Sequence, residues 1–314
     1  MTTSRVRLGI VLAVVMLAGC SSGSPSPTLT STPEPPPSAT PQPPSPTPMP
    51  TPIPIDQEML GRRFTVLVSG LDSSRGRRAA GITQYNTDAL MVVSVSADKS
   101  RIAMISLPRD TVDVPMADGT IYHGKINAIA QKLGIEALRS AMATLLGVPI
   151  DRYIEVDMDD FGWMVDIVGG IDVDVRTRIS DSQVHLHLDP GPTHMDGALA
   201  LSFSRSRADS DYARAARQQQ VVLALVRKWI EPALGSLAAS IRLLGSLKTD
   251  IALDELPTLL EIGRRSASAQ VSAIVLQPPR FSLFVGIEPK TIRGWVMIPN
   301  VPAMRAYAKA AFAD

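Results

Sequence analysis

The pattern of apolar and polar positions from about Gly61 to Asp314 predicts a mixture of strands and helices. Short apolar runs, some alternating with acidic residues, predict strands over 63–68, 90–95, 102–107, 153–156, 171–175, 271–276 and 281–285. Helical periodicity and breakers predict helices over 126–146, 159–168, 211–230, 237–247, 253–265 and 301–312. These elements interleave without a strict strand–helix–strand rhythm. We therefore expect an α/β fold, a single domain over 61–314 with a central mixed sheet flanked by helices on both faces.

Two of the predicted strands, 90–95 and 102–107, flank a polar turn at 97–100 and so predict a β-hairpin. Pro108 ends the second of them, because proline cannot donate to a central ladder. The two residues that follow Pro108 are an arginine and an aspartate. We expect them just past the end of a strand.

The first sixty residues have a different pattern. Two arginines precede a short apolar run, 8–18, which ends in small residues before Cys20. These are the features of a secretory signal, and the run is too short to span a membrane comfortably. Leu17-Ala18-Gly19-Cys20 resembles the lipobox of bacterial lipoproteins, which implies that 1–19 is a signal peptide and that Cys20 is lipidated. The alternative is an ordinary signal peptide with an incidental cysteine.

Residues 20–60 predict a disordered linker between the lipid and the domain. The part from Ser21 to Ile55 is mostly Pro, Ser and Thr, and it holds more than half of the chain's 26 prolines. Such a composition buries too little apolar surface to offset its ordering entropy. At roughly 3 Å per residue it would reach on the order of 100 Å.

Composition and charge exclude several classes of function. The formal net charge is +1, so bulk charge gives no indication of nucleic acid binding, and aromatic residues make up only 4% of the chain. Cys20 is the only cysteine, which excludes intrachain disulfides and cysteine-based zinc sites. Specificity must therefore come from local groups of polar residues.

Arginine is planar, permanently charged and able to bind phosphate with two hydrogen bonds. Arg205 and Arg207 would share one face if their segment were extended. Arg214 and Gln218 are four residues apart, so they share one face of a helix near its N-terminus, where anions are favoured. Asp211 is placed to cap this helix, or to hold an arginine or a metal.

Further along the same helix the sequence becomes apolar, at Val221, Val222, Leu225 and Trp229. A cationic end followed by an apolar stem fits a ligand with a phosphate head and a hydrocarbon tail. Core packing is the alternative explanation of the apolar stem. At predicted strand ends, Asp72 and Asp88 suit a hard divalent cation, because Mg²⁺ prefers a few carboxylates plus the substrate's phosphate oxygens.

Several motifs in order resemble the LytR-CpsA-Psr family, the envelope glycopolymer ligases. The resemblance covers essentially everything from about Phe64 to the C-terminus. It is carried by Gly70-x-Asp72, Thr87-Asp88, Ser106 to Asp110, Lys125 to Ala128, Val165-Asp166 with Gly169-Gly170 and Val173, Asp196 to Arg207, and Asp211 to Gln219.

The resemblance implies transfer of a phosphoglycan from a polyprenyl-pyrophosphate carrier to peptidoglycan, outside the cytoplasmic membrane, with the prenyl chain in an apolar groove. By the same resemblance, the pyrophosphate would be held by Arg109, Arg205, Arg207, Arg214 and Gln218, with Lys125 a weaker candidate. Mg²⁺ or Mn²⁺ would be held by Asp72 and Asp88. Either Asp110 or Asp211 would orient an arginine or take the acceptor's proton.

The chain also departs from the family pattern. Asn86 stands where many members have an arginine, and Arg75, Arg77 or Arg78 from the preceding loop could replace that charge. Only three residues, 208–210, separate the two arginine motifs, where many members have a longer segment. Anchoring by a lipid, in place of a transmembrane helix, is a third difference.

Two other functions use the same residues. With water as the acceptor, the site would be a polyprenyl-pyrophosphatase. Without turnover it would be a non-catalytic prenyl-lipid-binding protein, for which Asn86 is the best support. Separately, His185 and His187 would share a face if their segment were a strand, and with His194 they could bind a metal. A surface loop with incidental histidines is the commoner case.

Overall fold

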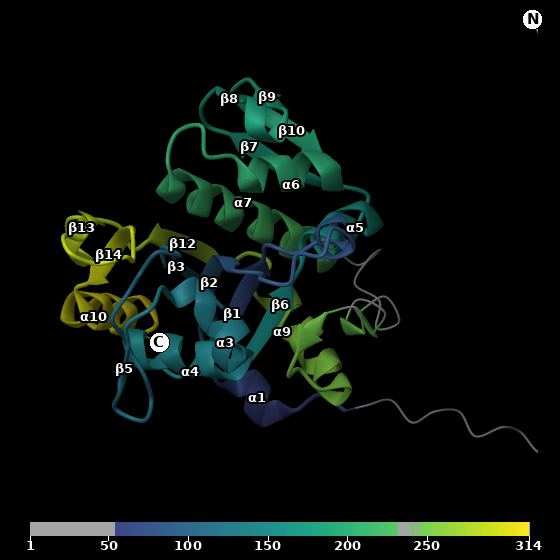
Figure 1. Ribbon diagram of the computed structural model, residues 1–314. Coiled ribbons are helices and arrows are strands. Elements are labelled where there is room, and N and C mark those ends of the chain that lie inside the picture. The colour runs from purple at the N-terminus through teal and green to yellow at the C-terminus, as the bar shows by residue number, and fades with distance from the viewer. Residues whose placement is uncertain (1–53, 232–239, 242–243, 246, 314) are drawn as a thin grey trace, which may run out of the picture. The chain divides into compact units, whose positions relative to one another are not determined.

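The computed structural model describes residues 54–231, 240–241, 244–245 and 247–313, and its centre is one mixed six-stranded sheet (Figure 1). The strand order is β11-β6-β1-β2-β3-β12. In chain order the strands are β1 (Phe64–Leu71), β2 (Thr87–Val95), β3 (Arg101–Ser106), β6 (Arg152–Val156), β11 (Lys248–Thr249) and β12 (Gln270–Val275). The predicted signal peptide, Cys20 and most of the predicted helix over 237–247 lie outside the described residues.

Strand direction brings distant parts of the sequence together. β2 is antiparallel to β1 and to β3, which confirms the predicted hairpin, while β6 and β12 run parallel to β1 and β3 respectively. The end of β1, the start of β2 and the end of β3 therefore lie side by side at one end of the central strands. The polar motifs around Asp72, Asp88 and Arg109 all lie at this end of the sheet.

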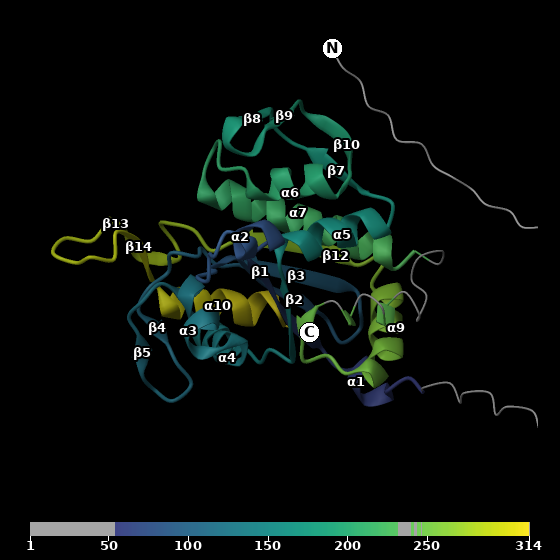
Figure 2. The ribbon, with the colours of Figure 1, turned by 45° about the vertical axis from the view of Figure 1, so that its right-hand side comes forward.

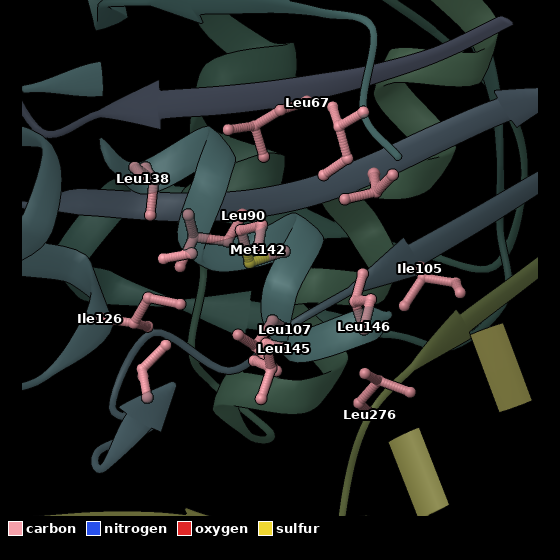
Figure 3. Close-up of a cluster of buried hydrophobic side chains, with 14 of the residues drawn as sticks. Leu67, Leu90, Ile105, Leu107, Ile126, Leu138, Met142, Leu145, Leu146 and Leu276 are labelled. Atoms are coloured by element: carbon pink, nitrogen blue, oxygen red, sulfur yellow. The ribbon is translucent and has the colours of Figure 1, made fainter. Parts of the chain in front are cut away.

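One face of the sheet is packed against helices. Successive strand residues point to opposite faces, and on this face Leu67, Val92 and Ile105 are almost fully buried. They belong to a core cluster with Leu138 and other residues of α4 (Ile135–Leu146), shown in Figure 3, and this cluster extends to α3 (Ile129–Leu133) and α10 (Val301–Ala311). Full burial of each such side chain stabilises the fold by about 1.5–3 kcal/mol.

The predicted single helix over 126–146 is wrong in one respect. The structure has a 3₁₀ turn, η1 (Ile126–Ala128), followed by α3 and α4, and Gly134 separates the two helices with φ = 93°. A positive φ is strained for residues with a side chain, so glycine permits the break. The apolar periodicity continues across it because both helices bury the same side.

The opposite face of the sheet is covered by α7 (Asp211–Trp229), which lies against β2, β3 and β12, and, toward one side, by α9 (Leu256–Arg265) (Figure 2). Beyond α7 lie α5 (Met158–Ile167), α6 (Gly197–Arg205) and small strands, so the helices flank both faces as expected. These small strands are β7 (Ile171–Val175), β8 (Ile179–Asp181), β9 (Leu186–Leu188) and β10 (Gly191–Met195), with the 3₁₀ turn η2 (Ser182–Val184) between β8 and β9. Only β7 is predicted from the sequence; β8 and β9 have three residues each, and β10 begins with Gly-Pro.

The folded part begins earlier than the predicted boundary at residue 61. The short helix α1 (Gln57–Gly61) buries Met59 and Leu60 against Phe64 and Ile262, so residues assigned to the linker belong to the domain. Among the described residues no helix is long and apolar enough to cross a membrane. The remaining elements are α2 (Arg75–Ala79), β4 (Val114–Pro115), β5 (Ile121–Tyr122), η3 (Leu253–Glu255), β13 (Ser282–Ile287) and β14 (Trp295–Pro299).

The crossing of α5 and α6 depends on two glycines in contact. A Cβ on Gly197 would clash with the backbone of Gly162, and the Gly197 N–H donates to the Asp166 carboxylate (2.7 Å).

We predict that Gly197→Ala lowers the free energy of unfolding by about 1–3 kcal/mol, because overpacking forces the helices apart. Urea unfolding measures this change. Gly61→Ala, where an added Cβ meets nothing within 4 Å, is the control; equal shifts in the two variants would contradict the prediction.

Candidate active site

Three arginines from three different elements converge on one carboxylate. The Asp88 Oδ2 atom near the start of β2 lies 2.5 Å from Arg109 Nη1, 3.3 Å from Arg207 Nη2 and 3.5 Å from Arg214 Nη1. Arg109 follows β3, Arg207 lies in the loop after α6, and Arg214 is in the first turn of α7. The site is therefore assembled by the tertiary fold and not by any one segment.

A second carboxylate, Asp211, closes the network. Its Oδ1 atom lies 2.9 Å from Arg214 Nη2, 3.5 Å from Arg207 Nε and 3.9 Å from Arg109 Nε. Of the alternatives that the sequence leaves open for Asp211, capping is excluded, because Ser210 is the N-cap of α7 and its hydroxyl accepts from the Ala213 N–H (3.0 Å). Asp211 instead holds the arginines together.

The arginines retain unused hydrogen-bonding capacity. Arg214 is only 4% exposed, and among the described residues its Nε, Arg109 Nε and Asp88 Oδ1 are buried without a hydrogen-bond partner. Burial lowers the pKa of Arg214, whereas for Arg109 burial is outweighed by the hydrogen bond that Arg109 donates to Asp88 together with the charges of Asp88, Asp110 and Asp211, so its pKa is raised. Both guanidinium groups stay charged at neutral pH. Such incompletely satisfied buried cations favour an additional anion.

Asp110 and Lys125 form a pair beside this network. Lys125 Nζ lies 2.7 Å from Asp110 Oδ1, and Asp110 Oδ2 lies 3.7 Å from Arg109 Nε. The Asn127 N–H donates to the Arg109 carbonyl (3.3 Å), which holds the turn containing Lys125 against the loop after β3. Asp110 thus orients a lysine and an arginine.

Two further predicted residues lie around the same site. Gln218 donates from Nε2 to the Ser204 carbonyl (3.3 Å). The Arg205 side chain is exposed and makes no hydrogen bond or ion pair within the described part of the chain. It is the last residue of α6, so the extended segment that would align it with Arg207 does not exist.

Asp72 follows β1 and has an arginine partner from the short helix α2. Arg77 Nη2 lies 3.3 Å from Asp72 Oδ2, whereas Arg78 pairs with Asp157 (2.8 Å). Three arginines, Arg75, Arg77 and Arg78, could supply the charge that Asn86 lacks. Of these, Arg77 is the one that pairs with Asp72. Asn86 itself contributes a backbone carbonyl, which accepts from the Asp72 N–H (2.9 Å).

A cavity of about 700 Å³ opens beside these charges. Its apolar walls come from the sheet face opposite the core, from α7 and from α9, including Val66, Met91, Met104, Val222 and Leu259. Its polar end is formed by Asp72, Asp88, Arg109, Arg205, Arg207, Arg214 and Gln218. Arg214 and Gln218 both line this cavity, as their spacing predicts.

The apolar stem of α7 serves two purposes. Val221 and Leu225 are buried in a second core cluster with Ile171 and Phe203, and both also line the cavity. Val222 and Trp229 line it as well. Both explanations of the stem, core packing and a lining for a ligand, therefore describe parts of the same helix.

Two residues of the Asp211–Gln219 motif position the site, and sequence analysis did not single them out. Arg217 is 5% exposed and binds Asp209 through Nη1 (2.8 Å) and Nη2 (2.9 Å), and its Nε donates to the Phe203 carbonyl (3.2 Å). Gln219 donates from Nε2 to Ser106 Oγ (3.0 Å) and the Ile274 carbonyl (2.7 Å). Their polarity in a helix that faces the sheet was the available signal.

The residues present fit a divalent ion at the polar end of the cavity. Asp72 and Asp88 both line it, and Asp88 Oδ1 has no described partner. One or two carboxylates, with substrate phosphates and water, are the ligands that Mg²⁺ usually takes. In the described part of the chain, no three His, Cys, Asp or Glu side chains gather as a metal cluster.

The histidines do not share a strand face. His185 ends a 3₁₀ turn with φ = 51°, and His187 lies in β9. His194 contacts Asp172 through Nδ1 (2.8 Å) across the β7–β10 pair. The strand that would align His185 with His187 is therefore not formed.

Comparison with known proteins agrees with this architecture. The LytR_cpsA_psr family model matches residues 51–285. The chain belongs to the LytR_cpsA_psr family. Its members with known structure include TagV of Bacillus subtilis, which is 26% identical, has a TM-score of 0.65, and is matched over 80% of this chain and 98% of that one. TagT bound to LIIa-WTA shares the fold at 22% identity and a TM-score of 0.61, over 81% of this chain and 91% of that one.

Two curated family members are similar in sequence. The polyisoprenyl-teichoic acid–peptidoglycan teichoic acid transferase TagV of Bacillus subtilis is 31% identical over 54% of this chain and 44% of its own length. TagU of Halalkalibacterium halodurans, with the same activity in its name, is 29% identical over 61% of this chain and 62% of its own length. The match thus spans roughly half of these relatives.

The loop that presents Arg207 depends on the Arg217–Asp209 ion pair. Burial alone would raise the pKa of Asp209, but the hydrogen bond and charge of Arg217, together with backbone hydrogen bonds, outweigh it, so the pKa is lowered. The pair therefore stabilises the fold above the ordinary Asp pKa of about 3.9, and this contribution is lost as the pH falls through the lower folded value.

We predict that Asp209→Asn lowers the free energy of unfolding at pH 7 by about 1–2 kcal/mol, because Arg217 loses its partner while Asp209 is partly screened by solvent. The difference from wild type should shrink below about pH 4. Urea unfolding at several pH values measures it. Asp174→Asn, on an exposed position of β7, is the control; a difference that does not depend on pH would refute this account.

Proposed function

We propose that this protein is an extracytoplasmic phosphotransferase that moves a phosphoglycan from a polyprenyl-pyrophosphate carrier to peptidoglycan. The observation that carries the proposal is the convergence of Arg109, Arg207 and Arg214 at the polar end of an apolar cavity of about 700 Å³. Both halves of a prenyl pyrophosphate, the charged head and the hydrocarbon tail, thus have a matching surface in one continuous site.

The arginines would bind the pyrophosphate. Guanidinium groups bind phosphate oxygens with paired, charge-assisted hydrogen bonds, and the free Nε groups of Arg109 and Arg214 provide donors that the protein does not use. Arg205, exposed at the same end of the cavity, and Lys125 add cationic groups that can meet the diphosphate or the glycan phosphate. Gln218 adds an amide donor on the same face of α7 as Arg214.

The apolar walls would hold the prenyl chain. Each methylene that leaves water contributes about 0.8 kcal/mol, so even part of a long prenyl chain gains substantial binding energy from this cavity. The walls come from alternate residues of the central strands and from α7, which makes the tail site as rigid as the sheet itself.

Asp72 and Asp88 would hold Mg²⁺ or Mn²⁺ together with the substrate phosphates, and the ion would neutralise their charge. The partnerless Asp88 Oδ1 supports this assignment. Asp88 also draws the three arginines toward the same point, so charge neutralisation and head-group binding share one residue.

In the transfer, a sugar hydroxyl of peptidoglycan would attack the phosphorus that carries the glycan. A new phosphodiester bond forms, and the bond from that phosphorus to the polyprenyl phosphate breaks. The hydroxyl proton would pass to Asp110 or Asp211, both of which lie beside Arg109. The arginines would stabilise the negative charge on the departing polyprenyl phosphate.

The proposed location follows from the N-terminal sequence. A signal peptide over 1–19 and a lipid on Cys20 would keep the domain on the outer side of the membrane, where a lipid-linked donor and the cell wall are both accessible. The names of the TagV and TagU relatives include polyisoprenyl-teichoic acid as donor and peptidoglycan as acceptor. We extend that donor and acceptor chemistry to this chain.

We predict that Arg207→Ala reduces transfer by roughly 10–100-fold, because a charge-assisted contact to the diphosphate is worth about 1.5–3 kcal/mol. The assay follows polyprenyl phosphate release and product formation by the purified protein with Mg²⁺, a polyprenyl-pyrophosphate glycan and peptidoglycan fragments. Arg227→Ala, an exposed arginine near the other end of α7, is the matched control. Equal rates in the two variants would exclude the proposed role of Arg207.

The same assay separates the two alternatives. A phosphotransferase releases polyprenyl phosphate faster when peptidoglycan fragments are added, whereas a pyrophosphatase is indifferent to them. Retention of the lipid without any release, with or without fragments, identifies a non-catalytic binder.

A further prediction concerns the metal. Asp72→Asn removes one anionic ligand, so half-maximal transfer should require a several-fold higher Mg²⁺ concentration, while saturating Mg²⁺ restores much of the rate. A titration of activity against Mg²⁺ concentration measures this. An unchanged titration midpoint would remove Asp72 from the metal site.

A further inference from the structure

The hairpin of β13 and β14 displays apolar side chains to solvent. Leu283 is 71% exposed, Ile287 is 74% exposed, and Ile292 in the connecting turn is fully exposed. Phe284 and Trp295 are also among the exposed large apolar residues. Figure 2 shows the hairpin projecting away from the rest of the domain. Several large apolar side chains exposed on one projecting hairpin are typical of an interaction site.

The base of the hairpin is fixed even though its tip is exposed. Phe281 is 3% exposed and Met297 is completely buried, and both belong to the main core cluster. Arg293 in the turn donates from Nη1 to Asp113 Oδ1 (2.9 Å) and to the His123 carbonyl (2.9 Å). The tip is therefore held in a defined position relative to the domain.

The hairpin is also joined directly to the candidate active site. The Met297 N–H donates to the Asp110 carbonyl (3.1 Å), and the Val112 N–H donates to the Met297 carbonyl (3.0 Å). Asp110 in turn pairs with Lys125. A surface bound by the hairpin tip would thus be held at a set orientation to the groups around Arg109.

The charge around the exposed apolar residues favours an anionic surface. The segment 280–295 contains three cationic residues, Arg280, Lys290 and Arg293, and one anionic residue, Glu288, which gives a net charge of +2. Glu288 pairs with Arg293, and Arg280 at the base lies over the rings of Phe281 and Tyr307, which leaves Lys290 as the exposed cation of the turn. Apolar side chains, a tryptophan and basic residues together are the composition of segments that bind at a membrane interface.

We propose that the tip of the β13–β14 hairpin inserts into the surface of an anionic lipid bilayer and docks the active site on it. Two features select a bilayer as the occupant: the net positive charge of segment 280–295, and the lipobox-like sequence that ends at Cys20, whose proposed lipid would place a bilayer within reach of the linker. The inference rests on the proposed function for its purpose, because the donor would lie in that bilayer. The tether sets how far the domain can move, and the hairpin sets its orientation.

The test uses the full-length lipidated chain in phosphatidylcholine vesicles with a quarter phosphatidylglycerol. Lipidation blocks the thiol of Cys20, the chain's single cysteine, so Ile292→Cys provides one site for an environment-sensitive dye. Leu253→Cys, at a 54% exposed leucine before α9, is the matched control. We expect nitroxides on the lipid acyl chains to quench the dye at 292 several-fold more than the dye at 253. Adding Leu283→Ser and Ile287→Ser should abolish that difference.

Equal quenching at the two positions, or none at 292, would overturn the proposal. A second result would also overturn it: the 292 dye is shielded from water, acyl-chain nitroxides do not quench it, and the shielding disappears as the protein is diluted across vesicles. That result indicates contact with a second copy of the chain. The measurement needs no donor or acceptor. Its failure is therefore distinguishable from failure of the proposed transfer reaction, which the Arg207→Ala comparison tests separately.

Discussion

The candidate site depends on the attraction of two carboxylates for three arginines that would otherwise repel one another. Asp88 and Asp211 lie between Arg109, Arg207 and Arg214. These five residues come from the ends of β2 and β3, from the loop after α6 and from α7. Most of the network is at least partly buried, so these charges are screened less than surface charges. The network forms only if the strand ends, the loop after α6 and the first turn of α7 are all correctly positioned relative to one another.

Residues outside this network hold its parts in position. Arg217 fixes the loop that carries Arg207, and Gln219 ties α7 to the ends of β3 and β12. Asp181 accepts from Ser206 Oγ (2.8 Å) and from the Arg207 N–H (2.9 Å), which holds the same loop from its other side. The position of one arginine is thus determined by contacts with elements on both sides of it.

The sequence predicts the sheet and the composition of the site better than it predicts local geometry. Alternating apolar residues reveal β2, β3 and their hairpin, because burial on a sheet face imposes a period of two. Periodicity could not show that Gly134 divides a helix whose two halves bury the same side. It also missed α6, which ends at Arg205, so the condition under which Arg205 and Arg207 would share one face of an extended segment is not met. Ser210 and Asp211 are both good capping residues, and only the backbone decides between them.

The sequence also does not reveal contacts between residues that are distant from each other along the chain. Arg217 binds the carbonyl of Phe203, and Gln219 binds the carbonyl of Ile274, fifty-five residues away. Backbone carbonyls leave no signature in the amino-acid sequence, so such contacts become visible only in three dimensions. Asp72 and Arg77 are closer in sequence, yet their pairing depends on how the loop after β1 turns back, which composition alone does not determine.

The cavity has a consequence for the protein's thermodynamics. One face of the central sheet packs directly on α3, α4 and α10, while a cavity lined by Val66, Met91 and Met104 separates part of the other face from α7 and α9. A prenyl chain bound there would act as a missing layer of the core. Folding and donor loading would then be linked equilibria, in which the loaded protein unfolds less readily than the empty one. The lipid carrier would be a structural component of the enzyme for as long as it stays bound.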